Sequence, residues 1–323
     1  MFNSLDIKRF RDEPVAILTG GTSREREISL KTGQAFEEAL RARGYEVEVY
    51  DVATDLPRLS AATPSAVLLG IHGGLGERGA LQGFLECLKI PYTGSGVLAS
   101  ALAMDKHRTR TICSTAAIPV ADGLWFDADD PDTVAHRVAR VDSELGFPVV
   151  AKLNDSGSSF GVYICHDGRE LTDALKELDR DVEATSSAGI LVESFVEGPE
   201  YTVGLFGDHC LGVIEIQPGE GFYDFEAKYE SNQTGYEIIT EASICDPLVA
   251  WAKRAFEILG CRGVARIDFK GRPDKQGAVA MLEANTIPGM TSTSLVPKMA
   301  AHQGMAFEDF VEAMLAAARL DVP

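Results

Sequence analysis

The sequence predicts a mixed α/β chain, α+β overall, that begins with a doubly wound parallel sheet. Strand-like and helix-like segments alternate between residues 14 and 94, which is the pattern of consecutive β-α-β units. Farther along, pairs of strand-like runs joined by glycine-rich connections predict hairpins. The 323 residues, 45% of them hydrophobic, can bury a large core and suffice for two or three domains.

Charge and cysteine usage exclude several classes of protein. The 30 Lys and Arg against 49 Asp and Glu give a net charge of −19, which repels a nucleic-acid backbone. A phosphate ligand would therefore need a local group of cations or a bound metal. The six cysteines are scattered without metal-ligand spacing, which indicates reduced thiols in a cytoplasmic protein. No signal peptide or membrane-length apolar run is evident.

The first region reads as strand, helix, strand, strand and helix. PVAILTGG is a buried strand that enters a glycine turn, and a helix is expected from about residue 27 to 43. The strands YEVEVYDV and SAVLLGIHG and a helix through GALQGFLECLK follow. Two glycine turns, GGTSRERE (20–27) and HGGLGERG (72–79), lie at the carboxyl ends of strands, where such sheets bind ligands. Each turn alone fits a solvated helix start or a flexible turn equally well.

A helix of small residues from Ser95 to Asp105 leads into a second region. There FPVVAKLND and FGVYICHD flank DSGSS, which predicts two strands joined by a glycine-serine loop. Backbone N–H groups in such a loop can bind an anion, and Lys152 on the preceding strand can reach the same phosphate. A third region carries long strands, a loop at 218–236 and a helix near 247–259. We expect the 218–236 loop to act as a lid.

Two motif matches point elsewhere and are rejected. TGSGVLA (93–99) fits a dinucleotide fingerprint, but it does not open the first β-α-β unit. GSSFG (157–161) fits a hydrolase elbow with Ser159 as nucleophile, but the elbow needs a following helix, and GVYIC is strand-like.

The most specific pattern is a hairpin formed by RIDFK (266–270) and AVAMLEANT across GRPDKQG. Side chains alternate along a strand, so Arg266 and Asp268 share one face, as do Glu283 and Asn285. The opposite face is expected to be core, and it consists of Ile267, Phe269, Leu282 and Ala284.

The polar face of this hairpin has the composition of a metal site. Mg²⁺ prefers oxygen ligands and takes one or two carboxylates together with substrate phosphates. We therefore predict Asp268, Glu283 and Asn285 as metal ligands, with Arg266 stabilising negative charge beside them. A surface salt-bridge network is the alternative, but it does not explain the uncharged Asn285 or the Pro-Gly turn after it.

Together these stretches resemble the D-alanine–D-alanine ligase family of the ATP-grasp superfamily. The matching motifs, in order, are GGTSREREISL, IHGGLGERGALQG, PYTGSGVLASALAMDK, GSSFGV, GPEYTV, FYDFEAKY, CRGVARID and LEANTIPGMTSTSLVP. The resemblance extends from residue 14 to about 315. It implies a three-domain ATP-grasp fold, divided into 1–94, 95–192 and 193–323, with ATP between the central and C-terminal domains.

The resemblance also implies a reaction and a set of roles. Two D-alanines and ATP would give D-alanyl-D-alanine, ADP and phosphate through an acyl phosphate, for peptidoglycan precursor synthesis. The implied substrate and catalytic residues are Glu25, His72, Ser158, Tyr229, Arg266, Gly289, Ser294 and Leu295. The implied nucleotide residues are Lys106, Lys152, Ser158, Ser159, Glu193, Val196, Glu200 and Lys228. Asp268, Glu283 and Asn285 would hold two Mg²⁺, or Mn²⁺ in their place.

Three positions depart from the family pattern. KLND lacks the usual proline after Lys152, Ser194 replaces a frequent lysine, and Arg78 replaces a usual acid. Two other functions stay open at this point: a ligase with another acceptor, such as D-lactate or D-serine, and a non-catalytic nucleotide sensor. Tyr229 argues against an ester-forming enzyme, and the presence of Arg266 and Glu283 argues against a sensor. We expect a cytoplasmic homodimer that binds small molecules and neither nucleic acid nor membrane.

Overall fold

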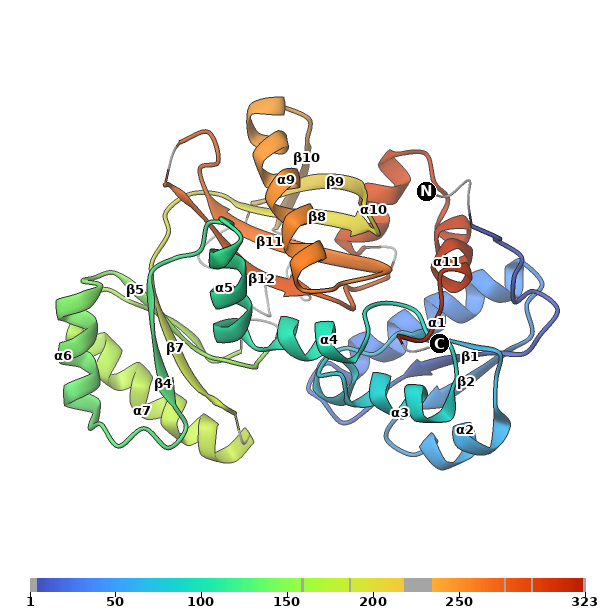
Figure 1. Cartoon of the computed structure of the whole chain (residues 1–323), viewed down its shortest axis with the longest axis horizontal. Helices are drawn as coiled ribbons and strands as arrows, with labels where there is room; N and C mark the ends of the chain where they lie inside the picture. The colour runs from blue at the N-terminus through green and yellow to red at the C-terminus, as the bar shows by residue number, and fades with distance from the viewer. Residues whose placement is uncertain are drawn as a thin grey trace.

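Three β-sheets organise the structure, a computed structural model that describes residues 5–157, 160–185, 187–217, 234–275, 277–291 and 293–321. Figure 1 shows the first sheet at the right, the second at the left and the third between them. Ser158, Ser159, Lys228 and Tyr229, and the predicted lid as far as residue 233, lie outside the described residues.

The first sheet is parallel, as predicted, with strand order β2-β1-β3. Every residue of its central strand is buried, which suits the unbroken apolar run VAILT. The helix α1 packs on one face of this sheet, and α2 and α3 pack on the other (Figure 1). Its elements are β1 (Val15–Thr19), α1 (Arg26–Ala42), β2 (Val47–Asp51), α2 (Leu56–Ala62), β3 (Ala66–Leu69), the 3₁₀ turn η2 (Gly74–Gly76) and α3 (Ala80–Leu88).

The second sheet is antiparallel, with order β4-β7-β5-β6, and two amphipathic helices pack against it. Its predicted hairpin is confirmed, because β5 pairs with β6 on either side of the glycine-serine loop. A strand rather than a helix therefore follows GSSFG, and the hydrolase elbow is ruled out. The elements are β4 (Gly123–Asp127), α6 (Val134–Glu144), β5 (Val149–Leu153), β6 (Val162–Cys165), α7 (Gly168–Thr185) and β7 (Gly189–Ser194).

The third sheet, with order β10-β9-β8-β11-β12, has helices on both faces. The helices α4, α5 and α9 share one hydrophobic core with it, whereas α10 and α11 pack on its other side. The elements are α4 (Val97–Met104), α5 (Lys106–Thr115), β8 (Glu200–Phe206), β9 (His209–Gln217), β10 (Gly235–Ile239), α9 (Ala242–Ile258), β11 (Val264–Gly271), β12 (Val279–Asn285), α10 (Leu295–His302) and α11 (Phe307–Ala316). α9 starts earlier than the predicted 247, because Pro247 is accommodated in its second turn.

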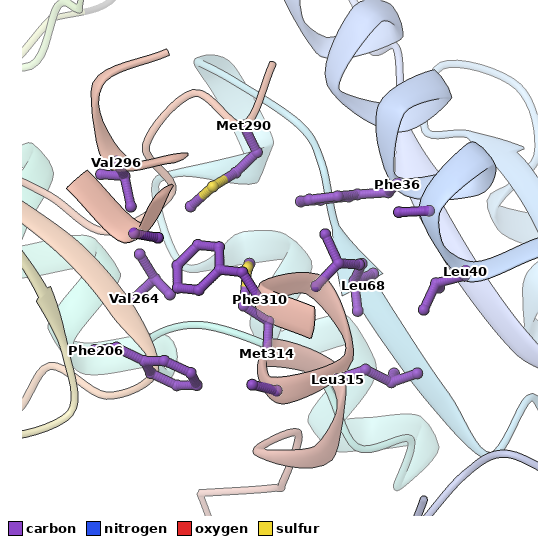
Figure 2. Packing of buried hydrophobic residues seen from close by; sticks show 14 of the residues in the cluster. Phe36, Leu40, Leu68, Phe206, Val264, Met290, Val296, Phe310, Met314 and Leu315 are labelled. Carbon is purple, nitrogen blue, oxygen red and sulfur yellow. The ribbon is translucent and has the colours of Figure 1, made fainter. Parts of the chain in front are cut away.

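The last helix joins the first sheet to the third. Figure 2 shows Phe310 of α11 between Phe36 and Leu68 on one side and Phe206 on the other. The Phe310 and Phe206 rings meet edge to face, with centroids 5.8 Å apart. Because residues of α1, β3, α11 and β8 share this core, the parallel sheet is packed firmly against the third sheet.

One core prediction was wrong, and a β-bulge is the reason. In the β11–β12 pair, Asp268 lies opposite Glu283 but Phe269 lies opposite Met281, so Leu282 is an extra residue. Met281 takes the expected place of Leu282 in the core, and Leu282 lines a cleft instead. Ile267, Phe269 and Ala284 are buried as predicted.

The six cysteines are free, as expected. No helix in the described part of the chain is long and apolar enough to cross a membrane.

Candidate active site

Two adjoining clefts contain the predicted site. One lies between the second and third sheets, and the other lies between the glycine turns of the first sheet and the segment that joins β12 to α10. They share Lys106, Ser156 and Glu283. Each predicted site residue within the described ranges lines at least one of them: Glu25, His72, Lys106, Lys152, Glu193, Val196, Glu200, Arg266, Asp268, Glu283, Asn285, Gly289, Ser294 and Leu295.

The cleft between the second and third sheets, which we call the inter-sheet cleft, has apolar walls and charged ends. About 890 Å³ of space lies between its walls, part of which is open solvent. The apolar wall residues are Val150, Val162, Phe195, Val196, Met281 and Leu282. The charged residues are Lys106, Lys152, Glu193, Glu200, Asp268, Lys270 and Glu283. A ligand that combines a flat apolar ring system with phosphate groups would fit a cleft of this kind.

A chain of three buried charges lies in this cleft. Lys152 Nζ is 2.5 Å from Glu193 Oε2, and Arg110 Nε is 3.2 Å from Glu193 Oε1. All three side chains are nearly inaccessible, so the attraction is weakly screened by water. Glu193 therefore holds Lys152 in place until a second anion, such as a phosphate, enters.

Lys106 stands where the two clefts meet. Its ammonium group donates a 2.5 Å hydrogen bond to the Ser156 carbonyl and lies 3.7 Å from Glu283 Oε2. A cation here can contact an anion in either cleft.

The predicted metal ligands come together on one hairpin. Arg266 lies opposite Asn285 and Asp268 lies opposite Glu283 in the β11–β12 register, as predicted. The Arg266 guanidinium donates to both Asp268 oxygens, with Nη2 to Oδ2 at 2.7 Å, and the Thr202 hydroxyl donates to Oδ1 at 2.6 Å. Asp268 is thus held in one orientation within a buried site.

These residues fit a hard divalent cation. Within the described ranges no group of three or more His, Cys, Asp and Glu is placed to hold a metal. The hairpin supplies two carboxylates and one carboxamide oxygen, all oxygen donors, and nucleotide phosphates would complete the shell.

The second cleft, which we call the turn cleft, contains Glu25 and His72 from the two glycine turns. His72 is buried, with 3% of its surface exposed. Its Nδ1 is 3.0 Å from the Ile287 carbonyl, and its Nε2 is 2.9 Å from the Thr32 hydroxyl. Since a carbonyl only accepts, Nδ1 carries the proton and Nε2 accepts from Thr32 in the neutral ring.

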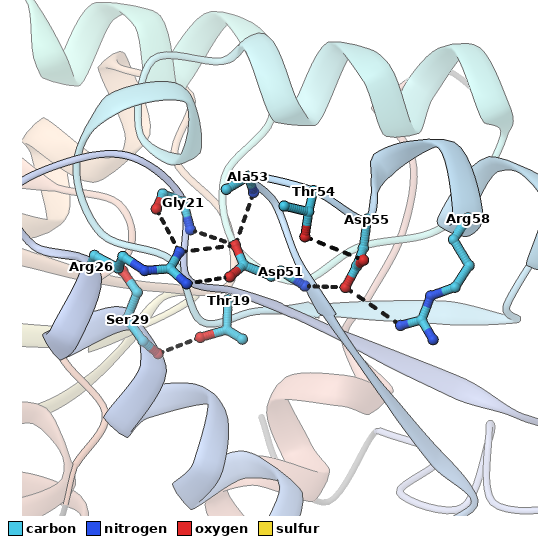
Figure 3. A network of polar contacts seen from close by, with 9 residues as sticks. All are labelled: Thr19, Gly21, Arg26, Ser29, Asp51, Ala53, Thr54, Asp55 and Arg58. Atoms are coloured by element: carbon cyan, nitrogen blue, oxygen red, sulfur yellow. Dashed lines mark hydrogen bonds and ion pairs between the residues drawn. The ribbon is translucent and has the colours of Figure 1, made fainter.

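A polar network braces the first glycine turn (Figure 3). Arg26 donates to both Asp51 oxygens, with Nη2 2.5 Å from Oδ2, and Gly21 N–H donates to Oδ1 at 3.0 Å. The hydrogen bond from Arg26 is the main reason that the Asp51 pKa falls to about 2. Ser23, which could have capped α1 with its side chain, instead links Glu25 N–H to the His72 carbonyl. Both turns are therefore held in register with each other.

The far wall of the turn cleft is a serine-threonine turn before α10. Ser294 Oγ accepts from Thr291 N–H at 3.0 Å and lies 2.9 Å from Thr291 Oγ1. A side chain at Gly289 would begin 2.9 Å from Ser294 Oγ, so the close approach requires glycine. The helix α10 begins at Leu295, and the start of a helix favours a carboxylate.

Sequence reasoning missed the residues that support the predicted ones. Ser29 and Thr32 hold His72, Thr202 holds Asp268, and Arg110 holds Glu193. Of these supporting residues, only Ser29 and Thr32 could have been found from the sequence. They lie one and two helical turns after Glu25 and therefore on the same face of α1. Glu77, Lys31, Tyr236 and Thr293 also line the turn cleft and were not predicted.

The chain resembles known ligases over nearly its whole length. The family model described as D-ala D-ala ligase C-terminus matches residues 112–316. A D-alanine–D-alanine ligase of Anaeromyxobacter sp. (strain Fw109-5) is 42% identical over 97% of this chain and 99% of its own length. One of Geotalea uraniireducens is 40% identical over 98% and 99%. A Bacillus anthracis D-alanine–D-alanine ligase complexed with ATP superposes with a TM-score of 0.80 at 27% identity, covering 94% of this chain and 97% of that one. The chain therefore belongs to the D-alanine–D-alanine ligase family of ATP-grasp enzymes.

Proposed function

We propose that the protein joins two D-alanines to D-alanyl-D-alanine with ATP, through D-alanyl phosphate, for peptidoglycan precursor synthesis. The observation that carries the proposal is the meeting of an apolar, cation-lined cleft with a polar cleft at Lys106 and Glu283. Such a junction is what transfer of a phosphoryl group to a small substrate requires. The similarity to the ATP-complexed structure supports the choice of nucleotide.

In this proposal the inter-sheet cleft holds ATP. The apolar walls, including Val196, enclose adenine, with Glu193 at the base and Glu200 near the ribose. Lys106 and Lys152 meet the phosphates, together with Lys228, Ser158 and Ser159. Lys152 leaves its close contact with Glu193 in exchange for phosphate oxygens, so its charge stays paired throughout.

Asp268, Glu283 and Asn285 would hold two Mg²⁺ beside the phosphates. Bound there, the metal ions would neutralise phosphate charge during transfer. Arg266, fixed by its paired contact with Asp268, lines the turn cleft. There Arg266 and the Gly289 N–H would stabilise the oxyanion of the tetrahedral intermediate.

The turn cleft would bind both amino acids. Glu25 pairs with the ammonium of the first D-alanine, and Ser158 and Tyr229 extend that contact. His72 lies beside the substrates as a ring oriented by its two hydrogen bonds. Ser294 and Leu295 hold the carboxylate of the second D-alanine at the start of α10. The first carboxylate attacks the γ-phosphorus and ADP leaves. The second amine then loses a proton and attacks the acyl carbon, and phosphate leaves.

The acceptor is proposed to be an amine, which makes the product a peptide. A phosphate-release assay over D- and L-amino acids tests the ligase assignment, and the ratio of the two products formed with both acceptors across pH tests the acceptor assignment. At neutral pH, D-alanine should outcompete equimolar D-lactate, and its advantage should shrink in acid as the amine stays protonated. Predominant D-alanyl-D-lactate at neutral pH would overturn the acceptor assignment, and no phosphate release with any D-amino acid would overturn the ligase assignment.

The remaining proposals concern organisation. The presence of three sheets supports a division into 1–94, 95–192 and 193–323, although the second boundary falls within β7 and α4 and α5 pack in the core of the third sheet. We also propose a cytoplasmic homodimer and a lid formed by the 218–236 segment. Gel filtration with light scattering tests the dimer, and limited proteolysis with and without ligands tests the lid.

A further inference from the structure

The turn between β5 and β6 is tied to the first sheet on both of its sides. On one side, Arg78 Nη1 donates to Asp155 Oδ2 at 2.8 Å, and Arg78 Nη2 donates to the Asp155 carbonyl at 2.8 Å. On the other side, the Arg24 guanidinium lies 3.7 Å from the centre of the Phe160 ring. Arg24 and Arg78 belong to the two glycine turns that carry Glu25 and His72.

The anchored turn touches both clefts. The Ser156 carbonyl accepts from Lys106 Nζ at the junction, and Ser156 lines both clefts. A side chain at Gly157 would begin 3.4 Å from Glu25 Oε2, so the turn backbone lies against the carboxylate proposed to bind the first D-alanine. A ligand that moves this turn therefore also moves one wall of the turn cleft.

Asp155 is held firmly enough to transmit such a movement. Its Oδ1 accepts a hydrogen bond from Ser187, and its Oδ2 accepts from Arg78, with the Asp155 side chain 14% exposed. The neighbouring Asn154 accepts from His107 N–H at 2.8 Å at the start of α5. Residues 154 and 155 therefore connect the first turn of α5, the residues just before β7 and the second glycine turn.

We infer that Arg78 and Asp155 are positioning residues that couple the nucleotide cleft to the site of the first D-alanine. The inference rests on the proposed function, because it assigns ATP and D-alanine to the two clefts. Arg78 is one of the three positions where this chain departs from the family pattern, and Asp155 ends the KLND segment that contains another, at Leu153. Through the Arg78–Asp155 pair, ATP should raise the affinity for D-alanine and D-alanine should raise the affinity for ATP by the same factor.

The test measures that factor directly. The affinity for a non-hydrolysable ATP analogue with Mg²⁺ is titrated with and without saturating D-alanine, in wild type, Arg78→Gln, Asp155→Asn and the double variant. Asn at 155 can still accept from Ser187, so only the charge pair is lost. Arg180→Gln, which breaks the exposed pair with Glu177 on α7, is the matched control.

We expect D-alanine to tighten analogue binding in wild type and in the control. Each single variant should reduce that enhancement by about fivefold, the upper end for a partly exposed ion pair. The double variant should lose no more than Arg78→Gln, because that single variant already removes the charge pair that Asp155→Asn breaks. Equal weakening with and without D-alanine, additive losses in the double variant, or no enhancement in wild type would each overturn the inference. Phosphate release by wild type on D-alanine, measured alongside, reports on the proposed function alone.

Discussion

The two clefts are built from different kinds of structure. The inter-sheet cleft takes most of its charged groups from strands, since Lys152, Glu193, Glu200, Asp268 and Glu283 all lie on β5, β7, β8, β11 or β12, and Lys106 comes from the start of α5. The turn cleft takes Glu25, His72, Gly289 and Ser294 from connections between elements, and only Arg266, Glu283 and Asn285 from the hairpin.

This difference determines what holds each side chain. Strand residues are fixed by the sheet itself, and their charges are opposed by other charges, as in the chain from Lys152 through Glu193 to Arg110. Loop residues need individual hydrogen bonds, such as those of His72 with the Thr32 hydroxyl and with the Ile287 carbonyl. We therefore expect substitutions in the inter-sheet cleft to act through charge, and those in the turn cleft to act through orientation.

The largest effect on turnover is expected at the carboxylates of the β11–β12 hairpin that are proposed to bind the metal ions. Glu283→Gln should reduce turnover by at least about a thousandfold, because a neutral amide withdraws several kcal/mol of transition-state stabilisation from the metals. Phosphate release at ordinary Mg²⁺ concentrations measures the loss. Glu257→Gln, an exposed position on α9, is the control. Near-normal turnover of Glu283→Gln would show that the negative charge of this hairpin residue is not needed for the reaction.

The chain of three buried charges predicts that two substitutions within it lower the free energy of unfolding by different amounts. Glu193→Gln leaves Lys152 and Arg110 without their counter-charge and should lower the free energy of unfolding by about 3 kcal/mol. Lys152→Met leaves the Arg110–Glu193 pair intact and should cost about 1 kcal/mol or less. Urea unfolding of the ligand-free variants measures both.

Saturating ATP with Mg²⁺ should recover part of the loss in Glu193→Gln, because phosphates would replace the missing anion. Equal destabilisation by the two substitutions would mean that the three charges do not act as a chain.

The same contrast explains what could be predicted from the sequence. Strand alternation was enough to place Arg266, Asp268, Glu283 and Asn285 on one face, because the side-chain period of a strand is fixed. It failed at Leu282, where an inserted residue shifts the period and the sequence carries no mark of the bulge. The parallel sheet was equally accessible, because its strands are unbroken apolar runs.

The turn cleft could not be assembled by such reasoning. Glu25, His72 and Ser294 are far apart in the sequence, and their proximity depends on how α11 packs between the first and third sheets. Family resemblance supplied these residues, but not the supports Thr32, Thr202 and Arg110. A support is chosen by the three-dimensional neighbourhood of the residue that it holds, and it has no fixed spacing in the sequence.

In the turn cleft the expected effects are smaller and more selective. Thr32→Val preserves shape but removes the hydroxyl at His72 Nε2, and it should raise the KM for D-alanine by about tenfold, the scale of one buried hydrogen bond. The affinity for ATP should be unchanged, because Thr32 lies outside the inter-sheet cleft. Steady-state kinetics with each substrate varied in turn measures this split, with Thr115→Val on the exposed side of α5 as control. Equal changes for both substrates would show that the clefts are not separable in this way.

The smallest effect is expected farthest from the reacting groups, at the brace beneath the first glycine turn. Asp51→Asn replaces the carboxylate that accepts from Arg26, and it should cost about 1 kcal/mol at neutral pH, since the pair is partly exposed. In the folded protein the Asp51 pKa is lowered from 3.8 to about 2, chiefly by the Arg26 hydrogen bond. A lowered folded-state pKa stabilises the fold above pH 3.8, and this contribution is lost as the pH falls toward 2.

The difference in unfolding free energy between wild type and Asp51→Asn should therefore be constant from pH 7 to about pH 5 and shrink toward zero below pH 4. Urea unfolding across this range measures it, with Asp142→Asn on the exposed side of α6 as the control that should show no such trend. Because Asp51 also accepts from Gly21 N–H, loosening this turn should raise the KM for D-alanine while leaving ATP binding unchanged. A pH-independent difference would mean that Arg26 holds the turn through its contact with the Gly21 carbonyl, at 2.7 Å, and that the charge of Asp51 contributes little.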